Sequence, residues 1–204
     1  ADVGTVSVTT VGTDGESELA CDSDGPLAAL VFKTAADPFG GRLSYFRVYS
    51  GTLGSDSQCW NANKSEAERV GQVFVVNGKS QDSLDSLAAG DIGALSRLNS
   101  VVTGDTISSR ENPIVIEGLN FPIPVHHMAV SPKTKADVDK MTSSLSRIVE
   151  EDPSLIVSRD EQTLEVIMQG LGDTHLDVAI EKMKRKFGVE LEMPIPRVPY
   201  METI

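Results

Sequence analysis

Ala28-Ala-Leu-Val-Phe-Lys-Thr-Ala-Ala-Asp-Pro-Phe-Gly-Gly-Arg-Leu-Ser-Tyr-Phe-Arg-Val-Tyr-Ser-Gly51 contains two strands joined by a turn. Together with the preceding Leu27, its first part up to Phe32 is an apolar run typical of a buried strand. The second part alternates, so that one face carries Phe46 and Val48 and the other Leu43, Tyr45 and Arg47. Gly40-Gly41 lies between them as a turn signal. This stretch therefore predicts β structure with one buried face.

The same pattern of short strands continues on the C-terminal side. Further strands are predicted at residues 69–76, 91–95 and 103–107, with turns at Ser50-Gly51 and Asn77-Gly78. Many short strands at this spacing favour a closed β-barrel, which we expect over residues 26–119. Residues 1–25 are rich in Gly, Ser, Thr and Asp and alternate only weakly. They are predicted to be a linker with one edge strand.

A different order of elements follows Asn120-Phe-Pro-Ile-Pro124, whose prolines mark a domain boundary. A strand is predicted at 125–130 and a helix at 136–151, which Pro153 ends. A hairpin at 155–158 and 164–169, a helix at 173–187 with Gly188 as its stop, and a strand at 189–193 complete the pattern. This order is that of a ferredoxin-like α+β domain, predicted over 120–198, with 199–204 as a linker.

Composition narrows the possible functions. The chain has 18 basic and 30 acidic residues, a net charge of −12, so any contact with RNA must use local basic patches. Cys21 and Cys59 are its two cysteines, which we expect to be free thiols, a disulfide being the alternative. No signal peptide opens the chain and no stretch is apolar enough to cross a bilayer, so we expect a cytoplasmic protein. The initial Ala suggests processing or excision.

The sequence contains no recognisable catalytic motif. The sequence has no Gly-x-x-x-x-Gly-Lys-Ser/Thr phosphate loop, and Asn63-Lys-Ser-Glu66 lacks the aspartate that a guanine-reading motif needs, so we interpret it as a solvated turn. His126 and His127 are adjacent in a strand and point to opposite faces, so they do not suit one metal ion. No cysteine or serine lies in a nucleophile motif. The residues therefore predict no catalytic group, cofactor or metal in this chain.

Several motifs, in the same order, resemble the elongation factor G family. Residues 28–51 are similar to the start of its domain II, and Ala89-Gly-Asp-Ile-Gly-Ala94 with Thr103-Gly-Asp-Thr106 to the end of that barrel. Pro132-Lys-Thr-Lys-Ala-Asp137, Glu150-Glu-Asp-Pro153 and Gly170-Leu-Gly-Asp-Thr-His-Leu-Asp177 resemble domain III, and Tyr200-Met-Glu-Thr-Ile204 the entry to domain IV. The resemblance implies a translation-protein β-barrel followed by a ferredoxin-like domain.

The resemblance also implies a function. The parent protein would be a translational GTPase that binds GTP and Mg²⁺ in a domain I absent from this chain and couples hydrolysis to ribosomal translocation. The fragment would be non-catalytic and monomeric. Its partners would be small-subunit ribosomal RNA, a small-subunit ribosomal protein and its own GTPase domain. Two alternatives are a ribosome protection or recycling factor on the same scaffold and a non-catalytic ribosome-docking module.

The resemblance points to basic residues that could contact the ribosome. Arg42 and Arg47 match basic positions of the barrel motif, and a guanidinium suits phosphate. Solvated or cross-strand charge is the alternative for both. Lys133 and Lys135 match the domain III loop that faces the ribosome or domain I, and simple solvation is again the alternative.

A second group matches the seam with domain I, near the fusidic-acid site of the family. His175 and the neighbouring Leu176 match its Gly-x-Gly-Glu-Leu-His-Leu motif, and Asp152, Ser154 and Lys182 match positions of the same region. The alternative is that His175 only packs a helix start. The family's Glu-Leu is Asp173-Thr174 here, its Thr is Ser154 and its Arg is Lys182, and the segment after Trp60 has fewer basic residues. These departures suggest a divergent paralogue and put fusidic-acid sensitivity and strong RNA contact in doubt.

Overall fold

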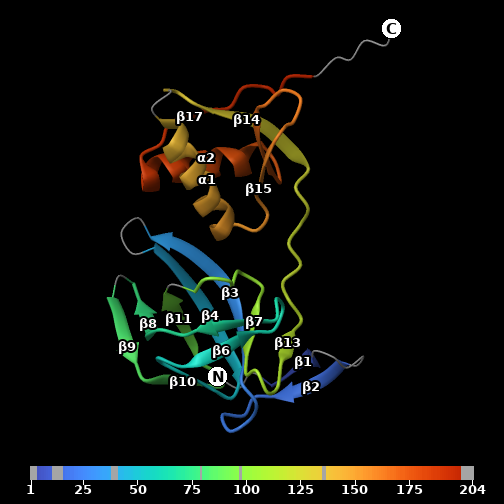
Figure 1. The fold of residues 1–204 in the computed structure, drawn as a ribbon, viewed down its shortest axis with the longest axis vertical. Helices are drawn as coiled ribbons and strands as arrows, with labels where there is room; N and C mark the ends of the chain where they lie inside the picture. The colour runs from blue at the N-terminus through green and yellow to red at the C-terminus, as the bar shows by residue number, and fades with distance from the viewer. Residues whose placement is uncertain are drawn as a thin grey trace. The chain divides into compact units, whose positions relative to one another are not determined.

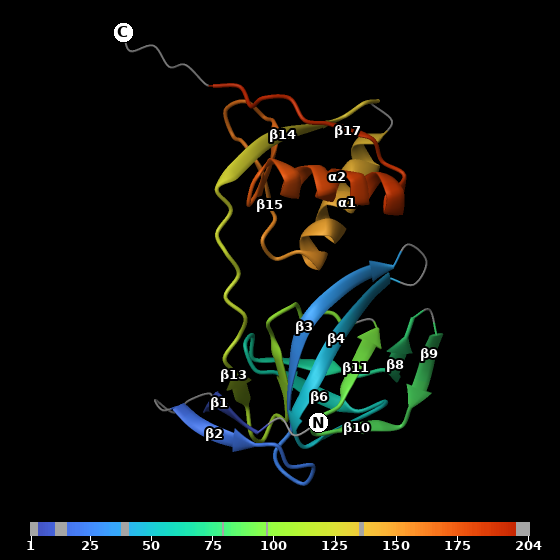
Figure 2. The same cartoon turned by 180° about the vertical axis from the view of Figure 1, so that it is seen from behind.

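The computed structural model of the chain describes residues 4–10, 16–37, 41–78, 80–96, 98–134 and 137–198. It divides into two compact units, Ala1–Asn120 and Phe121–Ile204, which Figures 1 and 2 draw from opposite sides. Each unit has its own apolar core and is described by itself. The predicted linker at 199–204 lies outside the described residues. Neither described helix combines the length and the apolar character needed to cross a membrane.

A curved antiparallel sheet forms the first unit, with the strand order β7-β6-β12-β3-β4-β11-β8-β9 (Figure 1). Its strands are β3 (Ala28–Asp37), β4 (Gly41–Ser50), β6 (Gln58–Asn61), β7 (Glu66–Arg69), β8 (Val73–Asn77), β9 (Ser80–Leu84), β11 (Ile92–Ser96) and β12 (Thr106–Ser108). The predicted alternation of β4 is confirmed, because Phe46 and Val48 are fully buried in the core while Tyr45 and Arg47 are partly exposed. The β-barrel prediction for this part of the chain is also confirmed.

The segment after β5 (Thr52–Gly54) links the strands β5 and β10 (Ser86–Ala88) to the start of β8. Strands β5 and β10 pair as a separate ribbon. Beyond it, the Ser55 N–H donates to the Asp85 carbonyl at 2.7 Å, and the Ser55 hydroxyl accepts from the Val73 N–H at 2.9 Å. The Val70 N–H donates to the Ser57 carbonyl at 2.9 Å. This last bond continues the pairing of β6 with β7 by one residue. The single strand predicted at 69–76 is wrong, because β7 ends at Arg69 and β8 begins at Val73.

A small sheet packs on the outside of the barrel. It consists of β1 (Thr5–Thr10), β2 (Glu16–Ala20) and β13 (Ile114–Ile116) in the order β13-β1-β2. Its buried Val8, Leu19, Ile114 and Ile116 form one apolar cluster with Ala28 and Leu30 of β3. The prediction of a linker with one edge strand missed β2, because residues 1–25 alternate only weakly. What forms β2 is its pairing with β1, which the local sequence does not reveal.

The second unit is a four-stranded antiparallel sheet with two helices, which confirms the ferredoxin-like prediction. Its elements are β14 (His126–Pro132), α1 (Val138–Glu151), β15 (Ile156–Arg159), β16 (Val166–Gly170), α2 (Asp173–Phe187) and β17 (Leu191–Glu192). The strand order is β15-β16-β14-β17. Met141, Leu145 and Ile148 of α1 and Leu176, Ala179 and Met183 of α2 share one core with Val130 and Met168 of the sheet.

Sequence signals set the ends of α2. Asp173 lies in its first turn and Lys184, Arg185 and Lys186 in its last, as the helix dipole favours. Gly188 follows in the left-handed region at φ 67°, and its N–H donates to the Lys184 carbonyl at 3.0 Å. The helix therefore ends where the glycine predicts. The predicted start of the other helix at Ala136 lies outside the described residues, and α1 begins at Val138.

Candidate functional site

A histidine and an aspartate link the two helices of the second unit. Asp152 directly follows α1, and His175 lies in the first turn of α2. His175 Nε2 is 2.9 Å from Asp152 Oδ2, and the backbone N–H of Leu171 donates to His175 Nδ1 at 3.0 Å. Because Nδ1 accepts, the neutral ring carries its proton on Nε2 and donates it to Asp152. The pair thus joins the end of α1 to the loop before α2.

Ser154 completes this cluster from the other side of the carboxylate. Its hydroxyl and its backbone N–H donate to Asp152 Oδ1 at 2.5 and 3.0 Å. Burial alone would raise the pKa of Asp152, but the hydrogen bonds from Ser154 and His175 outweigh it and hold that pKa below its ordinary value. Since the serine donates to the aspartate and not to the histidine, the cluster does not activate a nucleophile.

Lys182 joins the same region, whereas Leu176 does not. Asp152, His175 and Lys182 all line a hollow of about 20 Å³ between the helices, which is too small for a ligand. Lys182 Nζ lies 3.5 Å from Glu151 Oε2, an ion pair at the end of α1. Leu176 is 1% exposed and belongs to the core. Of the five residues that the family resemblance assigns to the contact with domain I, the structure thus brings four together. These are Asp152, Ser154, His175 and Lys182.

The other histidines do not form a metal site within the described residues. His127 is exposed, and His126 is partly buried with its Nε2 2.7 Å from Asp173 Oδ1.

Lys133 lies in an ion-pair network on the surface of the second unit. Its Nζ is 2.8 Å from Glu190 Oε2, and Lys184 Nζ is 2.8 Å from Glu190 Oε1. The hydrogen bonds from Lys133 and then Lys184 lower the pKa of Glu190 to about 2, and the same contact raises the pKa of Lys133. Lys135 lies outside the described residues.

The two candidate arginines of the barrel differ in their surroundings. Arg42 Nη2 donates to the carbonyls of Leu98 and Asn99, in the loop after β11. Arg47 instead lies over the Tyr49 ring, with its guanidinium carbon 5.8 Å from the ring centroid. Its Nε is shielded from solvent and has no hydrogen-bond partner among the described residues. Arg42 therefore donates hydrogen bonds to its own chain, whereas the Arg47 Nε has no acceptor among the described residues.

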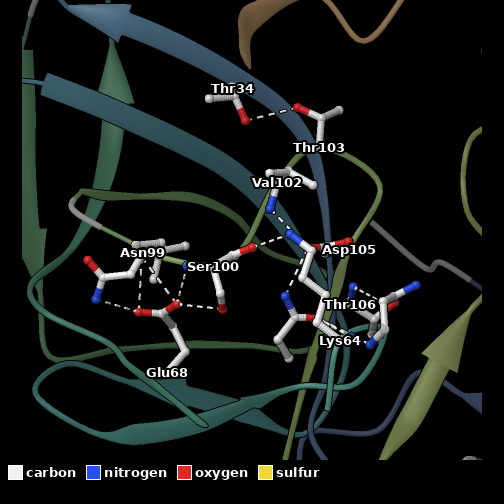
Figure 3. A network of polar contacts seen from close by, with 12 residues as sticks. Thr34, Lys64, Glu68, Asn99, Ser100, Val102, Thr103, Asp105 and Thr106 are labelled. Carbon is white, nitrogen blue, oxygen red and sulfur yellow. Dashed lines mark hydrogen bonds and ion pairs between the residues drawn. The ribbon is translucent and has the colours of Figure 1, made fainter. Parts of the chain in front are cut away.

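Two buried carboxylates, which sequence reasoning missed, hold the long loop between β11 and β12 (Figure 3). The Glu68 carboxylate accepts from the backbone N–H groups of Asn99 and Ser100 at 3.1 and 2.8 Å and from the Ser100 hydroxyl at 2.9 Å. Burial opposes ionisation of Glu68, yet these hydrogen bonds lower its pKa. No sequence signal marks Glu68, because its partners lie about thirty residues away.

Asp105 plays the matching role at the other end of that loop. Its Oδ2 accepts from Asn61 Nδ2 at 2.9 Å and from the Val102 N–H at 3.0 Å, and Lys64 Nζ lies at 3.4 Å (Figure 3). Asn63 Oδ1 accepts from the Thr106 N–H at 2.7 Å. The segment Asn63–Glu66, interpreted from the sequence as a solvated turn, begins in a turn. Its Asn63 and Lys64 also hold the loop between β11 and β12 in place.

Comparison with known proteins adds an independent finding. The family model described as Elongation factor G domain 2 matches residues 26–110, and the one described as Elongation Factor G, domain III matches residues 121–194. A crystal structure of a protein from Thermus thermophilus is similar at 30% sequence identity with a TM-score of 0.73. The similarity covers 86% of the present chain and 26% of the Thermus chain, so this chain spans about a quarter of that protein's length.

Proposed function

Because the chain belongs to the elongation factor G family through domains II and III, we propose that it is the central part of a ribosome-binding translational GTPase. The observation that carries the proposal is the order of the two domains, each with its own family match. The parent protein would use GTP to promote ribosomal translocation, and this part would pass the state of the nucleotide to the rest of the factor.

We propose that the chain itself does not bind the nucleotide. Its sequence has no phosphate loop, so the GTP and Mg²⁺ of the parent protein would be bound by a domain outside this chain. Titration calorimetry of the chain with GTP and Mg²⁺ should therefore give no heat of binding. Micromolar binding would contradict this part of the proposal.

The linked cluster of Asp152, Ser154 and His175 suits a coupling role. It ties the end of α1 to the start of α2, so a neighbouring domain that pressed on one helix would also displace the other. We propose that this cluster and Lys182 face the GTPase domain, and that Lys133, Lys135, Arg42 and Arg47 are the candidates for ribosome contact.

The test uses the complete gene product and ribosomes. His175→Ala should lower ribosome-stimulated GTP hydrolysis or translocation about tenfold, the size of a typical coupling effect. His127→Ala is the matched control, because His127 is exposed and outside the cluster. Equal activity of both variants would show that the cluster of Asp152, Ser154 and His175 takes no part in coupling. Ribosome-splitting activity without translocation would favour the recycling alternative.

A further inference from the structure

The outer face of the barrel carries a pocket built around Arg47. In the register of the sheet, Arg47 of β4 lies between Leu30 of β3 and Ile92 of β11, so the three side chains share one face. Together with Phe32, Tyr49 and Leu119 they line a cavity of about 260 Å³. The walls are thus apolar, and the guanidinium is the charged group among them.

This charge lacks a partner within the part of the chain that the structure describes. Its contact is the Tyr49 ring, its Nε is shielded and unpaired, and no carboxylate forms an ion pair with it. A shielded donor without an acceptor is costly, so native structures rarely keep one. Ligand binding that supplied an acceptor would remove this cost.

The apolar walls are themselves open. Phe32 is 36%, Leu119 48% and Ile92 52% exposed. An arginine surrounded by aromatic and aliphatic side chains is the composition found at the centre of protein–protein interfaces. The pocket therefore fits a partner that brings apolar surface and negative charge together.

RNA fits these observations less well. Residues 1–120 carry 16 acidic and 8 basic side chains, so the unit repels a phosphate backbone. Base stacking needs free aromatic faces, but three of the walls are aliphatic and Tyr49 already stacks with Arg47.

We propose that this Arg47 pocket receives a protein partner, through a carboxylate side chain that pairs with Arg47 and a neighbouring bulky apolar side chain that packs on Ile92 and Leu119. The proposal goes beyond the proposed function, because it gives Arg47, until now a candidate for ribosome contact, a protein partner whose binding requires neither a nucleotide nor a ribosome.

The test compares two peptides that differ in charge but not in shape, acetyl-Phe-Glu-Leu-amide and acetyl-Phe-Gln-Leu-amide. Each is titrated to millimolar concentration into the ¹⁵N- and methyl-labelled chain. We expect the glutamate peptide to shift the Arg47 Nε–Hε signal and the Ile92 and Leu119 methyl signals, and to bind about tenfold more tightly than the glutamine peptide. Equal binding of the two peptides, or shifts elsewhere, would overturn the proposal.

A pair of variants shows which charge is used. Arg47→Met should remove the preference for glutamate, whereas Arg110→Met should keep it. Arg110 is the matched control, because it is exposed and also lies over an aromatic ring, with its guanidinium carbon 5.4 Å from the Trp60 centroid. If Arg47→Met fails to fold, the comparison of the two peptides on the unchanged chain still decides.

Two further outcomes would replace the proposal. If a uridine decamer shifts the Arg47 Nε–Hε signal at lower concentration than the glutamate peptide, the pocket is an RNA site. If the pocket signals shift with protein concentration alone, its occupant is a second copy of the chain. Either result overturns the assignment to a separate protein partner.

Discussion

The two cysteines have different surroundings, which predicts different reactivity. Burial, and secondly the Glu68 carboxylate, raise the pKa of the Cys59 thiol to about 12. Cys21 is partly exposed. In the native chain at pH 8, Ellman's reagent should therefore label one thiol quickly, and in urea both. The Cys21→Ser variant should show almost no fast labelling; rapid reaction of that variant would contradict the burial of Cys59.

Asp152 predicts a pH-dependent stability of the second unit. Its native pKa lies below the unfolded value of about 3.9, so its stabilising effect is complete above that value and is lost as the pH falls through the native pKa. Ser154→Ala removes the hydroxyl donor, because alanine cannot replace the 2.5 Å hydrogen bond. The free energy of unfolding of the second unit should fall by about 1 kcal/mol in this variant at pH 7, and by less below pH 4.

Urea unfolding followed by the amide signals of α1 and α2 measures this loss at the two pH values. Ser158→Ala is the control, because Ser158 is an exposed serine of β15. A loss that is the same at pH 7 and at pH 3 would show that Ser154 acts by packing and not through the charge of Asp152.

At the scale of elements, one glycine sets the corner between β4 and β5. Gly51 has φ 73°, and a Cβ there would lie 2.7 Å from the Leu27 Cα and 2.9 Å from the Gly25 carbonyl oxygen. Both neighbours are backbone atoms and cannot move aside. Gly51→Ala should therefore destabilise the barrel by about 3 kcal/mol, with strain and steric overlap combined.

Trp60 provides the measurement, because it is the only tryptophan and lies in β6. Gly78→Ala is the control: Gly78 also has a positive φ, 61°, but nothing lies within 4 Å of its Cβ position. Gly78→Ala should lower the free energy of unfolding, measured with urea, by only about 1 kcal/mol. Equal losses for the two variants would mean that the close approach to Leu27 is not what requires Gly51.

The elements differ in how far the sequence could predict them. The period of two in β4 and the cap signals of α2 are local, so both elements were predicted closely. The break between β7 and β8 reflects their different partners, β6 for β7 and β9 and β11 for β8, and β2 depends on its pairing with β1. Such pairing leaves no local periodicity. Asp152, Ser154, His175 and Lys182 were predicted from the resemblance to the family. Glu68 was not, because it belongs to no motif and its hydrogen-bond partners are distant in the sequence.

At the scale of the whole molecule, the lysines are largely engaged within their own unit. Glu190 binds Lys133 and Lys184, and Glu151 binds Lys182 and Lys186. The net charge of −12 also opposes binding of the chain to an RNA phosphate backbone. For Lys133 to contact ribosomal RNA, a phosphate would have to replace Glu190, so this contact should weaken steeply as salt rises.

The distribution of the apolar cores predicts that each unit folds by itself. The barrel core and the cluster beneath the outer sheet use residues up to Ile116, and the ferredoxin-like core uses residues from Met128 onward. Since neither core borrows side chains from the other unit, residues 1–120 and 121–204 should each fold when expressed separately. Each piece should give a dispersed ¹H–¹⁵N spectrum that matches the intact chain away from Asn120 and should unfold cooperatively. A collapsed spectrum for 121–204 alone would show that the ferredoxin-like unit needs the barrel, and the coupling proposed for His175 would then have to include the barrel as a structural support.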